Sequence, residues 1–156
     1  MSQIGMIQTQ LGRFGEVQKA YERLLAINPN FGPALNNLTI IYSDQLSQLD
    51  KAYELAERAR KALPDDPHAA DTLGWIYFKK GLYYSALSLL EQSAAKLPAE
   101  LELQFHLGMA LSMVGNRDDA RHVLQRAAEA SKDFPDKEKA RRQLDELAKV
   151  PPRVME

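Results

Sequence analysis

The 156 residues are 45% apolar and 26% charged, which is typical of a folded chain rather than a disordered one. Twenty basic residues balance 21 acidic ones, and this argues against a nucleic-acid partner, because phosphate binding usually comes with a basic excess. Cysteine is absent, which excludes disulfides and thiolate chemistry, and no apolar run reaches the ~18 residues expected of a membrane span, so we expect no direct membrane insertion.

A repeat of about 34 residues organises the chain. Two of its copies align on the pairs Leu73-Gly74 and Leu107-Gly108. Each copy holds two segments with apolar residues at three- and four-residue spacing, which predicts two amphipathic helices per copy. A proline closes the first three copies, at positions 29, 64 and 98. In chain order we place four copies, at residues 1–31, 32–66, 67–100 and 101–134.

The glycines of these copies have two expected roles. Gly74 and Gly108 interrupt apolar helices at a cost of about 0.5–1 kcal/mol relative to alanine, which makes sense where a second helix crosses closely. Ala86 and Ala120 are the expected small partners at those crossings. The glycines that follow the first helices fit the left-handed residue that ends a helix, namely Gly12, Gly81 and Gly115.

The second copy departs from this pattern. Its turn, SDQLSQLD, has no glycine and carries one extra residue. Thr39 stands at the position that Gly74 and Gly108 occupy in later copies. We therefore expect a longer loop between its two helices and slightly different packing, without loss of the fold.

A polar-backed helix is predicted at about residues 136–149, after the fourth copy. Its apolar residues share one helical face, and these are Ala140, Leu144 and Leu147. Such a helix can cap a stack of repeats, whose last apolar side would otherwise face water. Residues 150–156 are expected to form a disordered tail. No comparable cap precedes the first copy, so we expect either a segment of a longer protein or a homodimer through the uncapped N-terminal repeat.

The leucine-glycine pair, the turn glycine, the small residue of the second helix and the closing proline resemble the tetratricopeptide repeat family. The resemblance implies an all-α fold, a right-handed α-solenoid of about four helix-turn-helix repeats. Residues 1–149 would then form a single domain that ends in the capping helix. The first helices of the repeats would line the concave side, where a partner is expected.

Groove-facing positions of the family, carried over to this sequence, give the candidate peptide-binding residues. Their aromatic and methionine members predict an apolar, adaptable patch, and their asparagines can hold a peptide backbone. Lys79 is the one cation among them, which argues against the clamp for a terminal carboxylate found in part of the family. The candidate residues are Asn36, Asn37, Ile40, Asp71, Trp75, Phe78, Lys79, Phe105, His106, Met109 and Met113.

The sequence indicates binding rather than catalysis. His68, His106 and His122 form no HxxxH or HExxH pair, and there is no phosphate loop of the GxxxxGK type. We therefore predict no catalytic residue, no metal ligand and no cofactor. The predicted function is an adaptor that binds a protein partner, as a peptide or an amphipathic helix, in the concave groove. The alternatives are a self-assembling scaffold and the recruitment segment of a larger protein, such as a glycosyltransferase or an envelope or polysaccharide-export component.

Overall fold

The computed structural model describes residues 14–149, and every regular element among them is helical, which confirms the all-α prediction for this part of the chain. The Gly12 turn, the helix expected before it and the tail at 150–156 lie outside the described residues. The helices are α2 (Phe14–Ile27), α3 (Gly32–Ile40), the π-helical turn η1 (Ile41–Gln45), α4 (Leu49–Ala62), α5 (Pro67–Lys79), α6 (Tyr83–Lys96), α7 (Leu101–Met113), α8 (Arg117–Glu129) and α9 (Lys137–Ala148).

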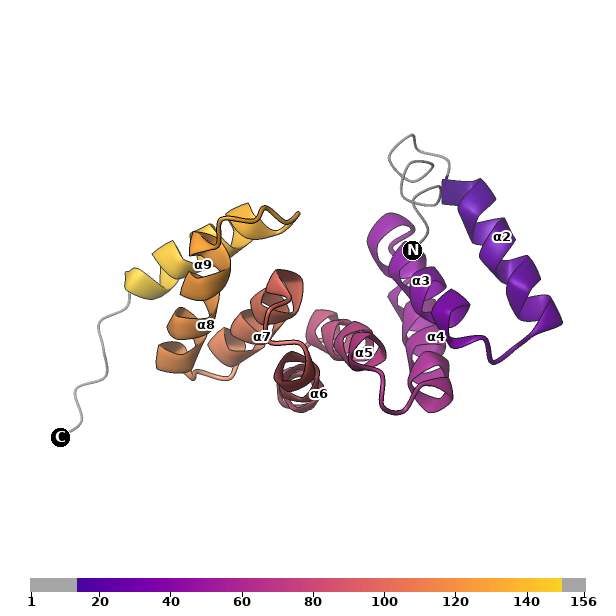
Figure 1. The fold of residues 1–156 in the computed structure, drawn as a ribbon, viewed down its shortest axis with the longest axis horizontal. Helices are drawn as coiled ribbons and strands as arrows, with labels where there is room; N and C mark the ends of the chain where they lie inside the picture. Colours follow the sequence, from indigo (N-terminus) through magenta and orange to yellow (C-terminus); the bar gives the residue numbers. More distant parts are fainter. Residues whose placement is uncertain (1–13, 150–156) are drawn as a thin grey trace.

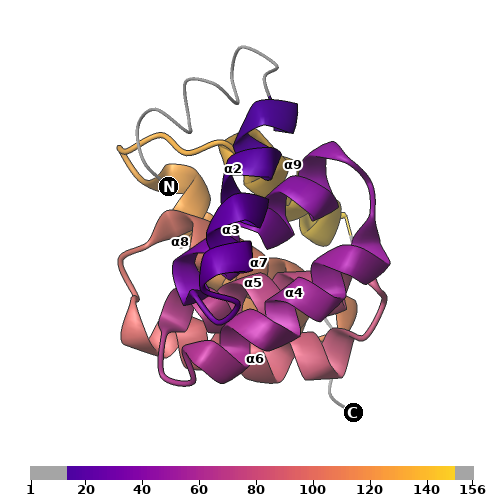
Figure 2. The same cartoon turned by 90° about the vertical axis from the view of Figure 1, so that its right-hand side faces the viewer.

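Consecutive helices pack side by side into an arch, an α-solenoid as predicted (Figure 1). The helices α3, α5, α7 and α9 also contact one another in that order, so they form a continuous inner layer. Figure 2, viewed toward the α2 end, shows α2 and α9 on one side of the molecule and α4 and α6 on the other. The two arms of the arch therefore rise on the same side, and the inner layer forms its concave surface.

The close helix crossings predicted at two glycines are confirmed, but their partners differ from the prediction. A Cβ atom added to Gly74 would lie 2.9 Å from the side chain of Leu90, and one added to Gly108 would lie 2.5 Å from that of Leu124. Ala86 is fully buried one helical turn before Leu90. The notch left by each glycine is thus filled by a leucine of the next helix, not by the alanine.

The turns between paired helices follow the expected chemistry. Gly81 and Gly115 have φ angles of 80° and 85°, so both adopt the predicted left-handed conformation. The amide of Leu82 donates to the Tyr77 carbonyl at 2.9 Å, which is the six-residue bond that closes a Schellman motif. At the start of α5 the Asp66 carboxylate accepts the amides of residues 68 and 69 and caps the helix.

The extra residue of the second copy lies in a widened helical turn, so the expectation of a longer loop is wrong. The amide of Leu46 donates to the Ile41 carbonyl at 3.2 Å, the five-residue spacing of a π-helix. The loop that follows has three residues, 46–48, as does the loop at 80–82. Ser47 takes the left-handed conformation there, with φ at 52°. The buried Thr39 donates its hydroxyl to the Leu35 carbonyl at 2.8 Å, so its polar atom is satisfied inside the helix.

The C-terminal end of the described chain is covered by α9. Ala140 and Leu147 are buried there and belong to the same apolar cluster as Leu124 of α8. Neither the capping role of this helix nor the expected repeat boundaries is tested, and both stay predictions. Within residues 14–149, no helix combines the length and the apolar character needed to cross a bilayer.

Candidate functional site

A cavity of about 730 Å³ lies on the concave surface. Its walls come from α3 and η1, from α5 across the middle, and from α7 and the start of α9. The inner layer of the arch therefore brings together side chains from positions 36 to 139. The candidate residues that line the cavity are Asn36, Asn37, Ile40, Asp71, Trp75, Lys79 and His106.

Four candidate residues do not line this cavity, and Phe105 is the clearest correction. Its side chain is only 1% exposed and lies in the core with its ring centroid 6.4 Å from that of Phe134. Met109 is half-buried in the same cluster, whereas Met113 is 47% exposed at the end of α7. Phe78 is half-buried and packs edge-on against Tyr83. Of the five residues of the predicted apolar patch, Trp75 alone lines this cavity.

Two aromatic rings of the cavity wall, those of Trp75 and His106, belong to a stack of three rings. Trp75 lies between Phe78, at a centroid distance of 4.5 Å, and His106, at 4.1 Å, and the planes are nearly parallel. The first two residues are three apart on α5, and the third comes from α7. Phe78 and His106 cover the two faces of the Trp75 indole. A molecule in the cavity would therefore contact the edge of the indole ring.

The imidazole of this stack also belongs to a buried polar pair. The Nδ1 atom of His106 is 2.8 Å from the Asp71 carboxylate, and the two residues are only 5% and 8% exposed. With Nδ1 donating to the carboxylate, the imidazole is held in one orientation, and Nε2 is the nitrogen that it can offer to the cavity. This pair ties α5 to α7 at the centre of the groove.

The charges along the cavity are mostly negative. Besides Asp71, four carboxylates line it, those of Asp44, Glu100, Glu102 and Asp136. Both lining lysines are already paired, since Lys79 contacts Asp44 at 2.5 Å and Lys139 lies 3.1 Å from Asp136. Lys79, predicted to be the groove cation, is thus neutralised by its neighbour.

The surrounding groove desolvates the Glu102 carboxyl and raises its pKa above its usual value, although the side chain is still exposed at the surface. His106 opposes the rise, and the negative charges of Asp71, Asp136 and Asp44 add to it. The direction is the one expected where several carboxylates share a partly enclosed surface. The groove therefore favours a positive group beside this carboxyl.

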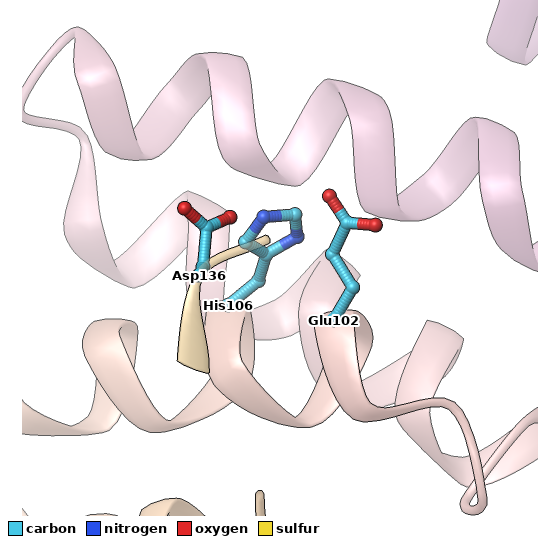
Figure 3. Close-up of side chains that lie close together, drawn as sticks. All are labelled: Glu102, His106 and Asp136. Carbon is cyan, nitrogen blue, oxygen red and sulfur yellow. The ribbon is translucent and has the colours of Figure 1, made fainter. Parts of the chain in front are cut away.

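Two further polar features lie in the cavity. The Oδ1 atom of Asn36 is buried and has no hydrogen-bond partner among residues 14–149. Glu102, His106 and Asp136 each offer a potential metal-ligand atom within 4.8 Å of the other two. Figure 3 shows the imidazole between the two carboxylates.

Sequence reasoning missed the grouping of these three residues. Glu102 and His106 are four apart on α7, a spacing that places two side chains on one helical face and was visible in the sequence. The position of Asp136 had no such signal, because it depends on how α9 returns toward α7.

Known families and structures match this chain in several ways. The family model described as "Tetratricopeptide repeat" matches residues 1–31, and the one described as "Anaphase-promoting complex, cyclosome, subunit 3" matches residues 45–127. TPR repeat-containing protein PA4667 of Pseudomonas aeruginosa is 30% identical over 103 residues, which are 66% of this chain. The aligned region is 17% of the relative's length, so this chain spans only a small part of that protein.

Among solved structures, the chain is similar to several MamA proteins. "MamA 41-end from Desulfovibrio magneticus RS-1" superposes with a TM-score of 0.73 at 20% identity, over 92% of this chain and 79% of that chain. "MamA AMB-1 P212121" has the same TM-score at 25% identity, over 93% of this chain and 83% of that chain. These likenesses extend over nearly the whole chain and agree with the arch of paired helices.

Proposed function

This chain belongs to the tetratricopeptide repeat family, and on that premise we propose that its concave groove binds a peptide or an amphipathic helix of a partner protein. The fold is that of protein-interaction adaptors and scaffolds in general. The observation that carries the finer proposal is the 730 Å³ cavity on the inner layer, whose volume suits a short segment of chain.

The chemistry of the lining favours a partner segment that carries lysine or arginine. Its carboxylates outnumber its lysines, and both lysines are already paired. A cationic side chain would gain from these charges, and the unpartnered Asn36 oxygen would accept a backbone or side-chain donor. The apolar ligand expected from the sequence fits less well, because Phe105 is buried.

Charge-matched peptides test this proposal. We expect a labelled helical peptide rich in lysine to bind at about micromolar affinity, on the order of −8 kcal/mol, and its glutamate counterpart to bind far more weakly. Replacing Glu100→Lys should weaken binding of the basic peptide several-fold, because this exposed residue lines the cavity. Glu91→Lys is the matched control, since Glu91 is exposed on α6 and does not line the cavity. Fluorescence anisotropy measures both, and equal affinity for the two peptides would contradict the proposal.

A second candidate function is self-association as a scaffold. It is favoured by apolar side chains left exposed on and after α2, where Ile27 is 84% exposed and Leu24 and Phe31 are about half as exposed. A second copy of the chain would cover them and form the homodimer expected from the sequence. Light scattering over a wide concentration range tests this candidate, and a strict monomer would remove it. That the chain is the recruitment segment of a larger protein stays a prediction.

A further inference from the structure

We propose that Glu102, His106 and Asp136 form a binding site for a divalent transition-metal ion. The potential ligand atoms lie within 4.8 Å of one another, and Figure 3 shows the His106 imidazole between the two carboxylates. Two of the residues come from α7 and the third stands at the start of α9. The site shares the Glu102 and Asp136 carboxylates with the proposed peptide groove, but its test requires no peptide.

His106 is oriented as a metal ligand requires. Its Nδ1 is bonded to the Asp71 carboxylate at 2.8 Å, so that Nε2 is the nitrogen left to bind an ion. Histidine ligands in proteins usually donate their other nitrogen to a carboxylate or carbonyl in this manner, which fixes the ring and increases its basicity. Only 5% of His106 is exposed, and the stacked Trp75 holds the imidazole plane in place. The His106 imidazole is therefore held in a fixed orientation before any ion binds.

The Asp136 carboxylate makes no contact that would prevent it from binding an ion. It occupies the N-cap position of α9, yet its side chain makes no capping hydrogen bond. Its ion-pair partner is Lys139, whose side chain is 69% exposed and can turn away into solvent. A divalent ion would replace this pairing with a stronger one.

Glu102 is the adjustable member of the site. It has no hydrogen-bond or ion-pair partner in the described part of the chain, and it is exposed enough to change rotamer. Metal–ligand bonds to oxygen and nitrogen are about 2.0–2.2 Å long, so the three atoms must draw closer together than they now lie. The freedom of the Glu102 side chain supplies that movement.

One imidazole nitrogen and two carboxylate oxygens suit zinc or a similar first-row ion, with further positions open to water or a partner group. Thiolate-seeking ions are disfavoured because the set has no sulfur ligand. A bound ion would link α7 to the start of α9 and fix one end of the groove.

Titration of the tag-free full chain with zinc chloride, followed by calorimetry, tests the site. We expect one ion per chain, and Glu102→Gln and Asp136→Asn should each weaken binding at least about tenfold. Glu100→Gln is the matched control, because it removes the same charge from the same cavity but lies outside the three-residue site, and it should leave the affinity unchanged. Circular dichroism verifies that the variants remain helical.

A second readout does not depend on any variant. In nitrogen-15 NMR spectra of the imidazoles, zinc should shift the Nε2 signal of His106 while those of His68 and His122 stay in place. Failure of zinc to bind, a loss of affinity in Glu100→Gln equal to that in Glu102→Gln, or an unshifted His106 signal would each overturn the proposal. None of these results would bear on the Glu100→Lys test of peptide binding.

Discussion

Glycines inside two helices of this protein differ in what surrounds them. An added Cβ at Gly108 would meet the Leu124 side chain at 2.5 Å, a distance that Cβ atoms do not reach in ordinary packing. At Gly15 in α2 the same addition would meet nothing within 4 Å. Glycine is thus required for packing at Gly108. At Gly15 it has no packing role and is only a poor helix former.

Alanine at these positions should have opposite effects on stability. We expect Gly108→Ala to lower the free energy of unfolding by about 1–3 kcal/mol through overpacking. Gly15→Ala should raise it by up to about 0.5–1 kcal/mol, the value for a helix interior, because alanine loses less backbone entropy in a helix and Gly15 is in the first turn of α2. Urea denaturation followed by circular dichroism measures both, and a neutral Gly108→Ala would show that the crossing tolerates a methyl group.

The sequence predicted where glycines were needed but not which residue faced them. Ala86 and Leu90 are four apart and share one face of α6, so periodicity could not decide which fills the notch at Gly74. Phe105 and His106 present a similar limit. Adjacent helical residues point about 100° apart, and the spacing alone did not show that only the histidine lines the cavity while Phe105 lies in the core.

The turn between α3 and α4 shows how a helix pair adapts to an insertion. The π-helical η1 absorbs the extra residue, which keeps the loop at three residues and preserves the pairing of the helices. Ser47 then occupies the left-handed position that Gly81 and Gly115 hold elsewhere. The sequence showed that one residue is inserted between the two helices. It did not show whether that residue widens the last helical turn or lengthens the loop, because both add one residue to the same segment.

Glycine should therefore be better than serine at this position. A non-glycine residue in the left-handed region costs about 1–2 kcal/mol, part of which the greater entropy of unfolded glycine offsets. We expect Ser47→Gly to increase stability by up to about 1 kcal/mol. Ser88→Gly, on the exposed side of α6, should instead decrease it by about 0.5 kcal/mol. Thermal melts of the two variants should shift in opposite directions, and a lower melting temperature for Ser47→Gly would refute this account of the turn.

At the scale of the whole molecule, each helix contacts chiefly its neighbours in the sequence, with further contacts between consecutive members of the inner layer. The stacked architecture could be predicted from the repeat. Each copy has an apolar face that it cannot bury alone, and stacking on the next copy buries that face. The charges on the concave side were predicted only in part, since Asp71 and Lys79 were candidate residues and Glu100, Glu102 and Asp136 were not. Their pairing was not predicted, because Lys79 and Asp44 lie 35 residues apart and meet through the packing of α5 beside α3 and η1.

The exposed apolar residues of α2 give a prediction at this scale. If copies of the chain associate there, Ile27→Lys should shift the protein toward the monomer, because a charge would be buried in the interface. Tyr84→Lys is the matched control, since Tyr84 is 77% exposed on α6, away from this surface. Light scattering compares the two variants, and an equal effect of both would argue against a specific interface.

The ring stack at the centre of the groove also provides an intrinsic fluorescence signal, that of Trp75. Trp75 is the single tryptophan of the chain, and it touches the imidazole of His106. Its emission therefore comes entirely from this one spot, without background from a second indole. Occupancy of the concave surface can accordingly be followed by intrinsic fluorescence on unlabelled, unmodified protein.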